Sequence, residues 1–300
     1  MKILLTGATG HSGRWFIKRL EREKFEGELV CIVREGRDTS HLAESGLNYT
    51  IVNCPLEDVE KLKKAMRGVD VVLHIAGIQV SKYIMEVAAL ENIDWAILVH
   101  TTGRYSRYKS ASAEYIRIED RILEERKSGT YKNVTIIRPT MIYGSQMDVN
   151  MHKLILYLNR HKFFPLFGNG RNLMQPVHAR DLGNAYYDIL MDPKTTKNKE
   201  YNLPGRSALP YLDIIRTVSS KLGRKNIIVK IPLGLSVAAA KIYNGLFGSR
   251  AIINVEQVLR MQEDKNFSYE DAANDFGYDP IGFEQGITEE IREMKKAGLI

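Results

Sequence analysis

Three glycines near the start of the chain have the spacing of a phosphate-binding turn. Gly7, Gly10 and Gly13 follow a short apolar run at 1–6 and precede an amphipathic segment at 14–20. The first glycine permits a sharp turn, the second lets the backbone approach a pyrophosphate, and the third lets the helix pack close to the strand. The free N–H groups and the positive dipole end of the helix then attract the anion.

The turn therefore predicts a dinucleotide site, and a purely structural glycine turn is the alternative interpretation. The residues expected to bind the cofactor here are Gly7, Thr9, Gly10, His11, Ser12 and Gly13.

The end of a second apolar run, 28–33, indicates which dinucleotide binds. In NAD-preferring folds an acidic side chain near this point bonds the ribose 2′-hydroxyl. Arg34 stands there instead, with Arg37 close by, and a guanidinium suits a 2′-phosphate. We therefore predict that NADP(H) is favoured. NAD(H) remains possible, because Glu35 is adjacent and Arg34 could be an ordinary surface residue.

Alternating strands and helices are expected to position these residues. Further apolar runs are typical of buried strands, and segments with helical periodicity lie between them. This alternation predicts an α/β fold, with a Rossmann-type doubly wound parallel sheet. The runs are 48–53, 70–77, 95–102 and 134–139, and the helical segments are 56–67 and 81–91. His74, at the end of one run, is expected to be a packed core histidine.

Composition narrows the class of protein. The 300 residues suit one large α/β domain or two interlocked ones, and the net charge of +7 is spread among interleaved acids. This pattern predicts a solvated surface with a bias toward phosphorylated small molecules and no nucleic-acid partner. Cys31 and Cys54 fall in apparent strands and predict reduced core thiols. With no signal-peptide pattern at the N-terminus, we expect a cytoplasmic location. No metal-ligand cluster is recognised.

One apolar stretch, 232–248, is too short to span a membrane and is interrupted by Lys241 and Asn244. We expect it to cover the mouth of the pocket, and no membrane partner is expected. Contact with a membrane surface is the second interpretation.

Several motifs carry a resemblance along the whole chain. They are the turn at 6–13, His74-Ile-Ala76-Gly77, Arg138-Pro139 followed by Tyr143-Gly144, and the segments 175–185, 201–205 and 268–280. The pattern resembles the extended branch of the short-chain dehydrogenase/reductase superfamily, the NAD-dependent epimerase/dehydratase family.

The resemblance implies a smaller C-terminal α/β substrate lobe beside the dinucleotide-binding domain. It places the first domain at 1–148, with 175–205 returning to it, and the lobe at 149–174 and 206–300. Within the lobe we expect an apolar turn at 163–170, and at the entrance to the next helix Asp181 is expected to be the N-cap.

The resemblance also assigns roles to single residues. Ala76 and Gly77 would leave room for the ribose and pyrophosphate, and Pro139 would lie beside the nicotinamide. The expected substrate contacts are Tyr143, Arg171 and Arg180, the two arginines reaching a substrate diphosphate. Pro55 stands where the family has an aspartate that holds adenine.

The family's chemistry needs a Tyr-x-x-x-Lys pair on a helix and a hydroxyl at the end of the fifth strand. Tyr105 and Lys109 have that spacing, but they are expected in the loop before the helix. A register fixed by Glu119 and by Arg138-Pro139 instead puts Ala111 and Tyr115 at the catalytic positions. The catalytic candidates that remain are Thr101, Thr102, Tyr105 and Lys109, and Thr101 is also expected to contact the cofactor.

Two functions follow from this departure. One is an epimerase/dehydratase-like NAD(P)-dependent oxidoreductase acting on a sugar nucleotide or a related, possibly phosphorylated, small molecule. The other is a non-enzymatic NADP(H)-binding redox sensor or an assembly protein. A homodimer is possible in either case.

Overall fold

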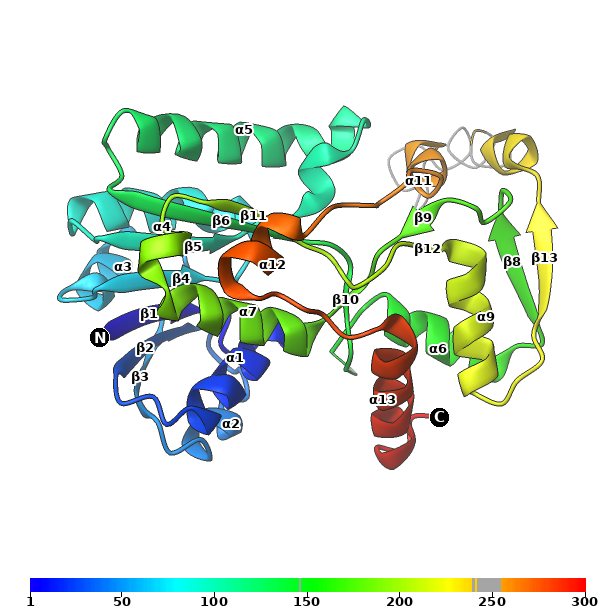
Figure 1. The fold of residues 1–300 in the computed structure, drawn as a ribbon, viewed down its shortest axis with the longest axis horizontal. Helices are drawn as coiled ribbons and strands as arrows, with labels where there is room; N and C mark the ends of the chain where they lie inside the picture. The colour runs from blue at the N-terminus through cyan, green and yellow to red at the C-terminus, as the bar shows by residue number, and fades with distance from the viewer. Residues whose placement is uncertain (146, 239–240, 242–254) are drawn as a thin grey trace.

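A seven-stranded sheet forms the larger part of the computed structural model, which describes all residues except 146, 239–240 and 242–254 (Figure 1). All neighbouring strands are parallel, in the order β11-β6-β5-β4-β1-β2-β3. The strands are β1 Lys2–Thr6, β2 Glu28–Val33, β3 Asn48–Asn53, β4 Val71–His74, β5 Trp95–Val99, β6 Asn133–Pro139 and β11 Glu200–Leu203. The predicted doubly wound α/β fold is confirmed.

Helices cover both faces of this sheet, which is why its strands read as nearly continuous apolar runs. Along β1, Ile3 and Leu5 point into one core and Leu4 points into the other, as the period of two requires. The first core is closed by α1 His11–Arg22 and α7 Ala179–Met191. The second is closed by α3 Val59–Met66, α4 Ser81–Leu90 and α5 Lys109–Lys127. Short helices α2 Ser40–Ala43 and α8 Pro193–Thr196 lie in the connections.

The C-terminal part of the chain builds a third core beside the sheet (Figure 1). It is formed mainly by α6 Met151–Arg160, α9 Tyr211–Lys221 and α13 Phe283–Lys296, together with the two-stranded ribbon of β8 Phe163–Phe167 and β13 Ile227–Ile231. Two strand pairs join this part to the sheet, β7 Ile142–Tyr143 with β10 Val177–His178, and β9 Leu173–Met174 with β12 Leu209–Pro210. Two further helices are α11 Val255–Arg260 and α12 Glu270–Phe276.

Three local expectations were wrong. The segment 163–170 is not a turn throughout, because Phe163–Phe167 pairs in parallel with Ile227–Ile231, a partner that sequence proximity could not reveal. Lys109 is not in a loop but is the first residue of α5. Asp181 is not the N-cap of α7: the His178 side chain accepts the capping bond from the Arg180 N–H, and Asp181 accepts instead from the Ile281 N–H at 3.0 Å.

Other expectations have simpler outcomes. Cys31 and Cys54 are free and buried, and burial raises the pKa of Cys31 to about 12. The segment 232–248, which was expected to cover the mouth of the pocket, lies mostly outside the described residues. Within the part of it that is described, residues 233–238 are helical. Within the described chain, no helix has the length and apolar character that crossing a membrane requires.

Candidate dinucleotide-binding site

A cleft of about 910 Å³ opens at the carboxyl ends of β1, β2, β4, β5 and β6. The strand order reverses between β1 and β4, and such a switch point is where open parallel sheets bind ligands. Of the predicted cofactor residues, those that line the cleft are Gly7, Gly10, His11, Ser12, Arg34, Ala76, Gly77 and Pro139. Thr9, Gly13 and Thr101 are not among its lining residues.

The glycine turn has the geometry that its sequence predicts. Gly7 has φ +79°, and its carbonyl accepts from the Gly10 N–H at 2.9 Å. A Cβ on Gly13 would collide with the Gly7 carbonyl oxygen, so only glycine lets α1 start this close to the strand. The first turn of α1 contains no acidic residue, which leaves the positive end of the helix free to attract an anion.

Hydrogen bonds next to this turn connect the end of β1 with the end of β4. The Thr6 hydroxyl accepts from the backbone N–H groups of Ile75 and Ala76, at 3.1 and 3.3 Å, and lies 2.7 Å from His74 Nδ1. His74 Nε2 lies 3.0 Å from the Gly77 carbonyl oxygen. Burial lowers the His74 pKa to about 4, so the ring is neutral and structural, as predicted.

His11 is the one ionisable side chain of this turn. Its ring lines the cleft, and burial lowers its pKa to about 4 although a hydrogen bond to the Gly144 backbone opposes the shift. Its Nε2 has no hydrogen-bond partner among the described residues. The ring is therefore neutral, and it adds no positive charge to the expected phosphate position.

The adenosine end of the cleft carries mixed charge. Arg34 and Lys61 line it together with Glu35 and Glu57. Asp38, a further acid after β2, is paired with Arg14 at 2.9 Å. The site thus holds cations able to meet a 2′-phosphate and acids able to meet a 2′-hydroxyl, so geometry alone does not choose between NADP and NAD.

The opposite end, where the resemblance expects the nicotinamide, is lined by Val99, His100, Pro139 and Ile142. The two threonine hydroxyls after β5 are already engaged. Thr101 Oγ1 accepts from the Gly103 N–H at 3.0 Å, and Thr102 Oγ1 donates to the Pro139 carbonyl at 3.2 Å. Neither threonine lines the cleft.

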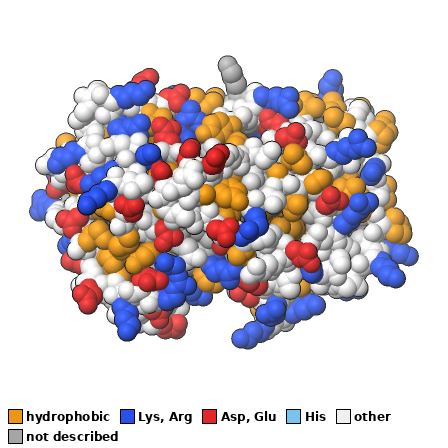
Figure 2. Space-filling view, in the orientation of Figure 1, with side chains coloured by type: hydrophobic (Ala, Val, Ile, Leu, Met, Phe, Trp, Pro, Cys, Tyr) orange, Lys and Arg blue, Asp and Glu red, His pale blue; other side chains and the backbone are white. Residues whose placement is uncertain are grey.

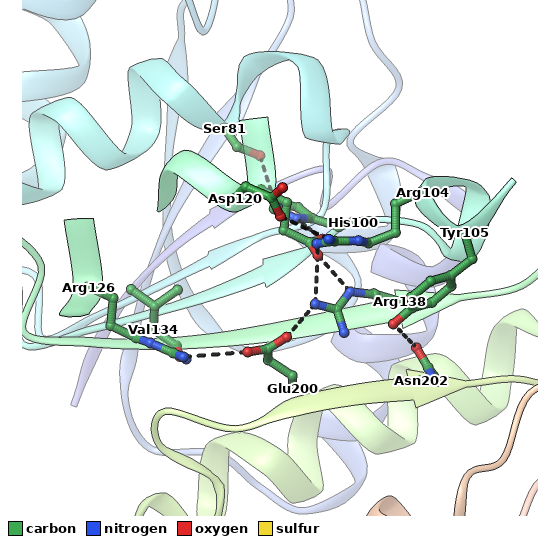
Figure 3. A network of polar contacts seen from close by, with 11 residues as sticks. Ser81, His100, Arg104, Tyr105, Asp120, Arg126, Val134, Arg138, Glu200 and Asn202 are labelled. Carbon is green, nitrogen blue, oxygen red and sulfur yellow. Dashed lines mark hydrogen bonds and ion pairs between the residues drawn. The ribbon is translucent and has the colours of Figure 1, made fainter. Parts of the chain in front are cut away.

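Tyr105 does not line the cleft either, and Figure 3 shows it directed toward Asn202. Its hydroxyl donates to Asn202 Oδ1 at 3.2 Å, and its ring packs at 5.4 Å from Phe267 and 5.7 Å from the Arg138 guanidinium. This catalytic candidate is therefore not directed into the cleft, because contacts with β11 and with the segment before α12 hold its side chain outside.

A buried polar network reaches this end of the cleft through His100, which is one of its lining residues (Figure 3). Glu119 is fully buried and accepts from His100 Nδ1 at 2.7 Å and from Arg138 Nε at 2.8 Å. Arg104 also pairs with Glu119, and His100 Nε2 lies 3.2 Å from the Ser81 hydroxyl. Arg138 reaches Glu200 on β11 at 2.5 Å.

The charges in this network stabilise one another. Burial alone would raise the pKa of Glu119, but hydrogen bonds from His100 and Arg138 lower it to about 2. Burial lowers the pKa of His100 despite its bond to Glu119. Sequence reasoning used Glu119 and Arg138 only to fix the register, and it missed His100, whose position at the end of a buried strand was the available signal.

The Glu119–Arg138 contact supports that register on α5. On that register, which the resemblance implies, Ala111 and Tyr115 stand where the family has tyrosine and lysine. The Tyr115 hydroxyl accepts from Gln79 Nε2 at 3.5 Å.

The predicted substrate residues do not line the cleft. Tyr143 is buried and donates to the Phe283 carbonyl at 3.5 Å, and burial raises its pKa. Arg180 pairs with Glu289 at 2.9 Å and lies over the Trp15 ring. Arg171 is exposed between β8 and β9.

A buried carboxyl next to this region was also missed. Glu290 on α13 accepts from the Gly144 N–H at 2.9 Å, directly after Tyr143. Burial raises its pKa to about 8, and the nearby Asp148 carboxylate adds to the shift. The residue lies 146 positions from its partner, so no local pattern could have identified the contact.

Fold and cleft together define a dinucleotide-binding protein of the short-chain dehydrogenase/reductase type. The family model described as "NmrA-like family" matches residues 1–297, and the chain belongs to this family. NAD(P) binding is typical of that family, and the chain is an NAD(P)-binding member.

Individual relatives are distant. The chain is 24% identical over 252 residues to the mitochondrial NADH dehydrogenase [ubiquinone] 1 alpha subcomplex subunit 9 of Arabidopsis thaliana, covering 78% of this chain and 61% of that protein. It thus spans about three-fifths of the length of the curated relatives it matches first. It is 22% identical to the decarboxylating sterol-4-alpha-carboxylate 3-dehydrogenase of Dictyostelium discoideum, covering 96% and 99%.

Solved structures share the fold at low identity. UDP-glucuronic acid 4-epimerase from Bacillus cereus, in complex with UDP-glucuronic acid and NAD, superposes with a TM-score of 0.76 at 18% identity, covering 99% of this chain and all of that one.

Proposed function

We propose that this protein binds NADP(H) as a retained or sensed ligand and does not turn it over. The proposal rests on the side chains at the end of the cleft where the resemblance expects the nicotinamide, which we call the hydride end. Ala111 and Tyr115 occupy the catalytic register, and Thr101, Thr102 and Tyr105 are committed to internal hydrogen bonds. His100 is held by Glu119 and Ser81. The dinucleotide would then report redox state or stabilise an assembly.

Preference for NADP(H) rests on Arg34. Its guanidinium lines the adenosine end and makes no ion pair within the described chain, which leaves it available to a 2′-phosphate. A charge-assisted hydrogen bond contributes about 1.5–3 kcal/mol, which corresponds to roughly a 10- to 100-fold difference in affinity.

A binding measurement tests this preference. We expect NADP(H) to raise the unfolding temperature more than NAD(H), because ligand at about 100 times its dissociation constant adds roughly 2.7 kcal/mol. Arg34→Ala should weaken NADP(H) binding about 10-fold or more and leave NAD(H) binding unchanged. Arg37→Ala is the matched control, since Arg37 is exposed but does not line the cleft. Equal affinity for both dinucleotides would contradict the preference.

A second candidate is an NAD(P)-dependent reductase or dehydrogenase. It is favoured by the alignment with the sterol dehydrogenase over nearly the whole of both chains. A sugar-nucleotide substrate has less support, because Arg180 is neutralised by Glu289 and Arg171 lies away from the cleft. Single-turnover absorbance of bound NADPH, followed against a panel of carbonyl compounds and sugar nucleotides, separates the candidates. Any hydride transfer would overturn the non-enzymatic proposal in favour of the second.

A further inference from the structure

The end of the C-terminal part that is farthest from the parallel sheet has a basic hollow. The hollow has a volume of about 290 Å³ and lies between the end of α6 and the start of β13. Its lining residues are Asn159, Arg160, His161, Lys162, Arg224, Lys225 and Asn226. Four of these seven are Arg or Lys and none is acidic. No ion pair joins any of the four to another residue in the described part of the chain.

Amide contacts hold the walls of this hollow in place. Asn226 Nδ2 donates to the carbonyls of Leu158 and His161, at 2.9 and 2.6 Å. Arg224 Nη2 donates to Asn159 Oδ1 at 3.0 Å. The hollow is therefore a fixed concavity of positive charge and not a chance meeting of surface lysines.

The surrounding sequence has a consistent charge bias. Segments 149–180 and 214–238 contain ten of the 43 Lys and Arg residues of the chain and none of its 36 Asp and Glu residues. The rest of the chain is consequently net acidic. These two segments, which contain no acids, account for the excess positive charge, whereas bases and acids are interleaved over the rest of the chain.

An exposed apolar surface continues from the hollow. We call it the apolar ribbon, and it consists of Phe163, Pro165, Ile227 and Val229. Phe163 is paired with Ile227 and Pro165 with Val229, so the period of two puts all four on one face. Phe163 is 54% exposed, and Ile227 and Val229 are each 46% exposed.

The other face of the same two strands packs inward. Leu166 is buried in the third core, and Phe164 and Ile228 pack against it. The exposed face is therefore the outward one.

Hollow and ribbon are contiguous. Lys162 precedes Phe163, Asn226 precedes Ile227, and the Ile227 N–H donates to the Lys162 carbonyl at 2.8 Å. Figure 1 places β8 and β13 at the end of the molecule opposite the N-terminus, and Figure 2 shows hydrophobic and Lys/Arg side chains together at that end.

We propose that this end binds the surface of a membrane containing anionic phospholipid. The hollow receives a lipid phosphate headgroup, and the apolar ribbon enters the boundary between headgroups and acyl chains. A basic surface beside exposed apolar side chains has the chemistry of peripheral membrane binding. The sequence led us to expect no membrane partner, because these side chains come together only when β8 pairs with β13.

Two other occupants fit less well. Nucleic acid would meet the cations but leave the aliphatic side chains of Ile227 and Val229 against a polar backbone. A second copy of this chain, docked by two-fold symmetry, would bring two acid-free basic surfaces together.

Vesicle flotation tests the proposal. We expect the protein to float with vesicles of phosphatidylcholine and phosphatidylglycerol, to stay behind with phosphatidylcholine alone, and to dissociate as salt is raised. Equal binding to both vesicle types, or binding to neither, would overturn it. If inorganic phosphate raises the unfolding temperature while neither vesicle binds, the hollow is a site for a free anion.

Matched variants assign the effect to the two parts of the surface. Lys162→Gln with Lys225→Gln should weaken binding about 25-fold, since each surface cation contributes roughly fivefold. The control pair is Lys64→Gln with Lys127→Gln, both exposed on the dinucleotide-binding part. Phe163→Ser should weaken binding about tenfold, and its control is Leu90→Ser, at a side chain 60% exposed.

Unchanged thermal unfolding of each variant shows that it folds. Equal losses in the test and control variants would overturn the assignment. A concentration-dependent dimer that Phe163→Ser abolishes, without vesicle binding by the parent protein, would assign the ribbon to a second copy instead.

Discussion

The two ends of the cleft are built by different means. At the phosphate end, Gly7, Gly10 and the first turn of α1 turn mainly backbone groups to the cleft, and a phosphate bound there would need few side chains. At the hydride end, side chains are abundant but bond to one another, as His100, Glu119 and Arg138 do. The comparison shows that polar residues near a cleft indicate catalysis only where their donor and acceptor atoms remain free to bond a ligand.

Breaking the network at the hydride end should have the largest effect. Glu119→Ala removes the buried carboxylate shared by His100 and Arg138 and leaves Arg138 paired with Glu200 alone, and we expect the free energy of unfolding to fall by about 3–5 kcal/mol. Denaturant unfolding measures this change. Glu124→Ala, at an exposed position on the same helix, should cost less than about 0.5 kcal/mol. Similar losses in the two variants would show that the network does not stabilise this end.

The buried carboxyl of Glu290, which accepts from the Gly144 N–H, makes stability depend on pH. Folded Glu290 has a pKa of about 8 against an ordinary value of 4.5. The contribution of this carboxyl to the free energy of unfolding is fully present below about pH 4.5. It is lost as pH rises to about 8, because only the unfolded chain releases the proton in that range.

Glu290→Gln should remove this slope. Between pH 5 and pH 8 we expect the free energy of unfolding of the parent to fall by about 3 kcal/mol more than that of the variant. Urea unfolding at several pH values measures the difference. Parallel pH profiles for the two proteins would contradict the raised pKa.

The phosphate end can be broken by a single methyl group. Gly13→Ala places a Cβ against the Gly7 carbonyl, and we expect a loss of about 1–3 kcal/mol together with loss of NADP(H) binding. Gly234→Ala is the control, because nothing lies within 4 Å of its Cβ position. Calorimetric titration and thermal unfolding measure both effects. Retained binding with unchanged stability would show that the close approach is unnecessary.

The smallest effect is expected from Tyr105→Phe. Among the described residues its hydroxyl bonds to Asn202 alone, so we expect a loss of about 0.5–1.5 kcal/mol of stability and no change in dinucleotide affinity. Titration with NADPH checks the affinity. A large loss of affinity would show that this tyrosine contacts the dinucleotide. The hydride end would then, like the phosphate end, offer groups to the ligand.

The sequence by itself determined the features that depend on near neighbours in the chain. The turn from Gly7 to Gly13 lies within one strand-turn-helix unit, and strands such as 48–53 are marked by their own apolar runs. Their physical requirements are local: positive φ, a helix N-terminus, burial on both faces. Length and pattern were therefore enough to predict the sheet and the phosphate end.

Only the tertiary structure decided what depends on distant partners. Tyr105 turns toward Asn202, 97 residues away, and Glu290 meets Gly144 across 146 residues. Phe163–Phe167 becomes a strand because Ile227–Ile231 pairs with it, which also brings Lys162 and Lys225 to the same hollow. Hydrogen bonds between such distant segments, and the burial that their packing causes, set the direction and the pKa of a side chain. The spacing of residues within one segment does not encode these contacts.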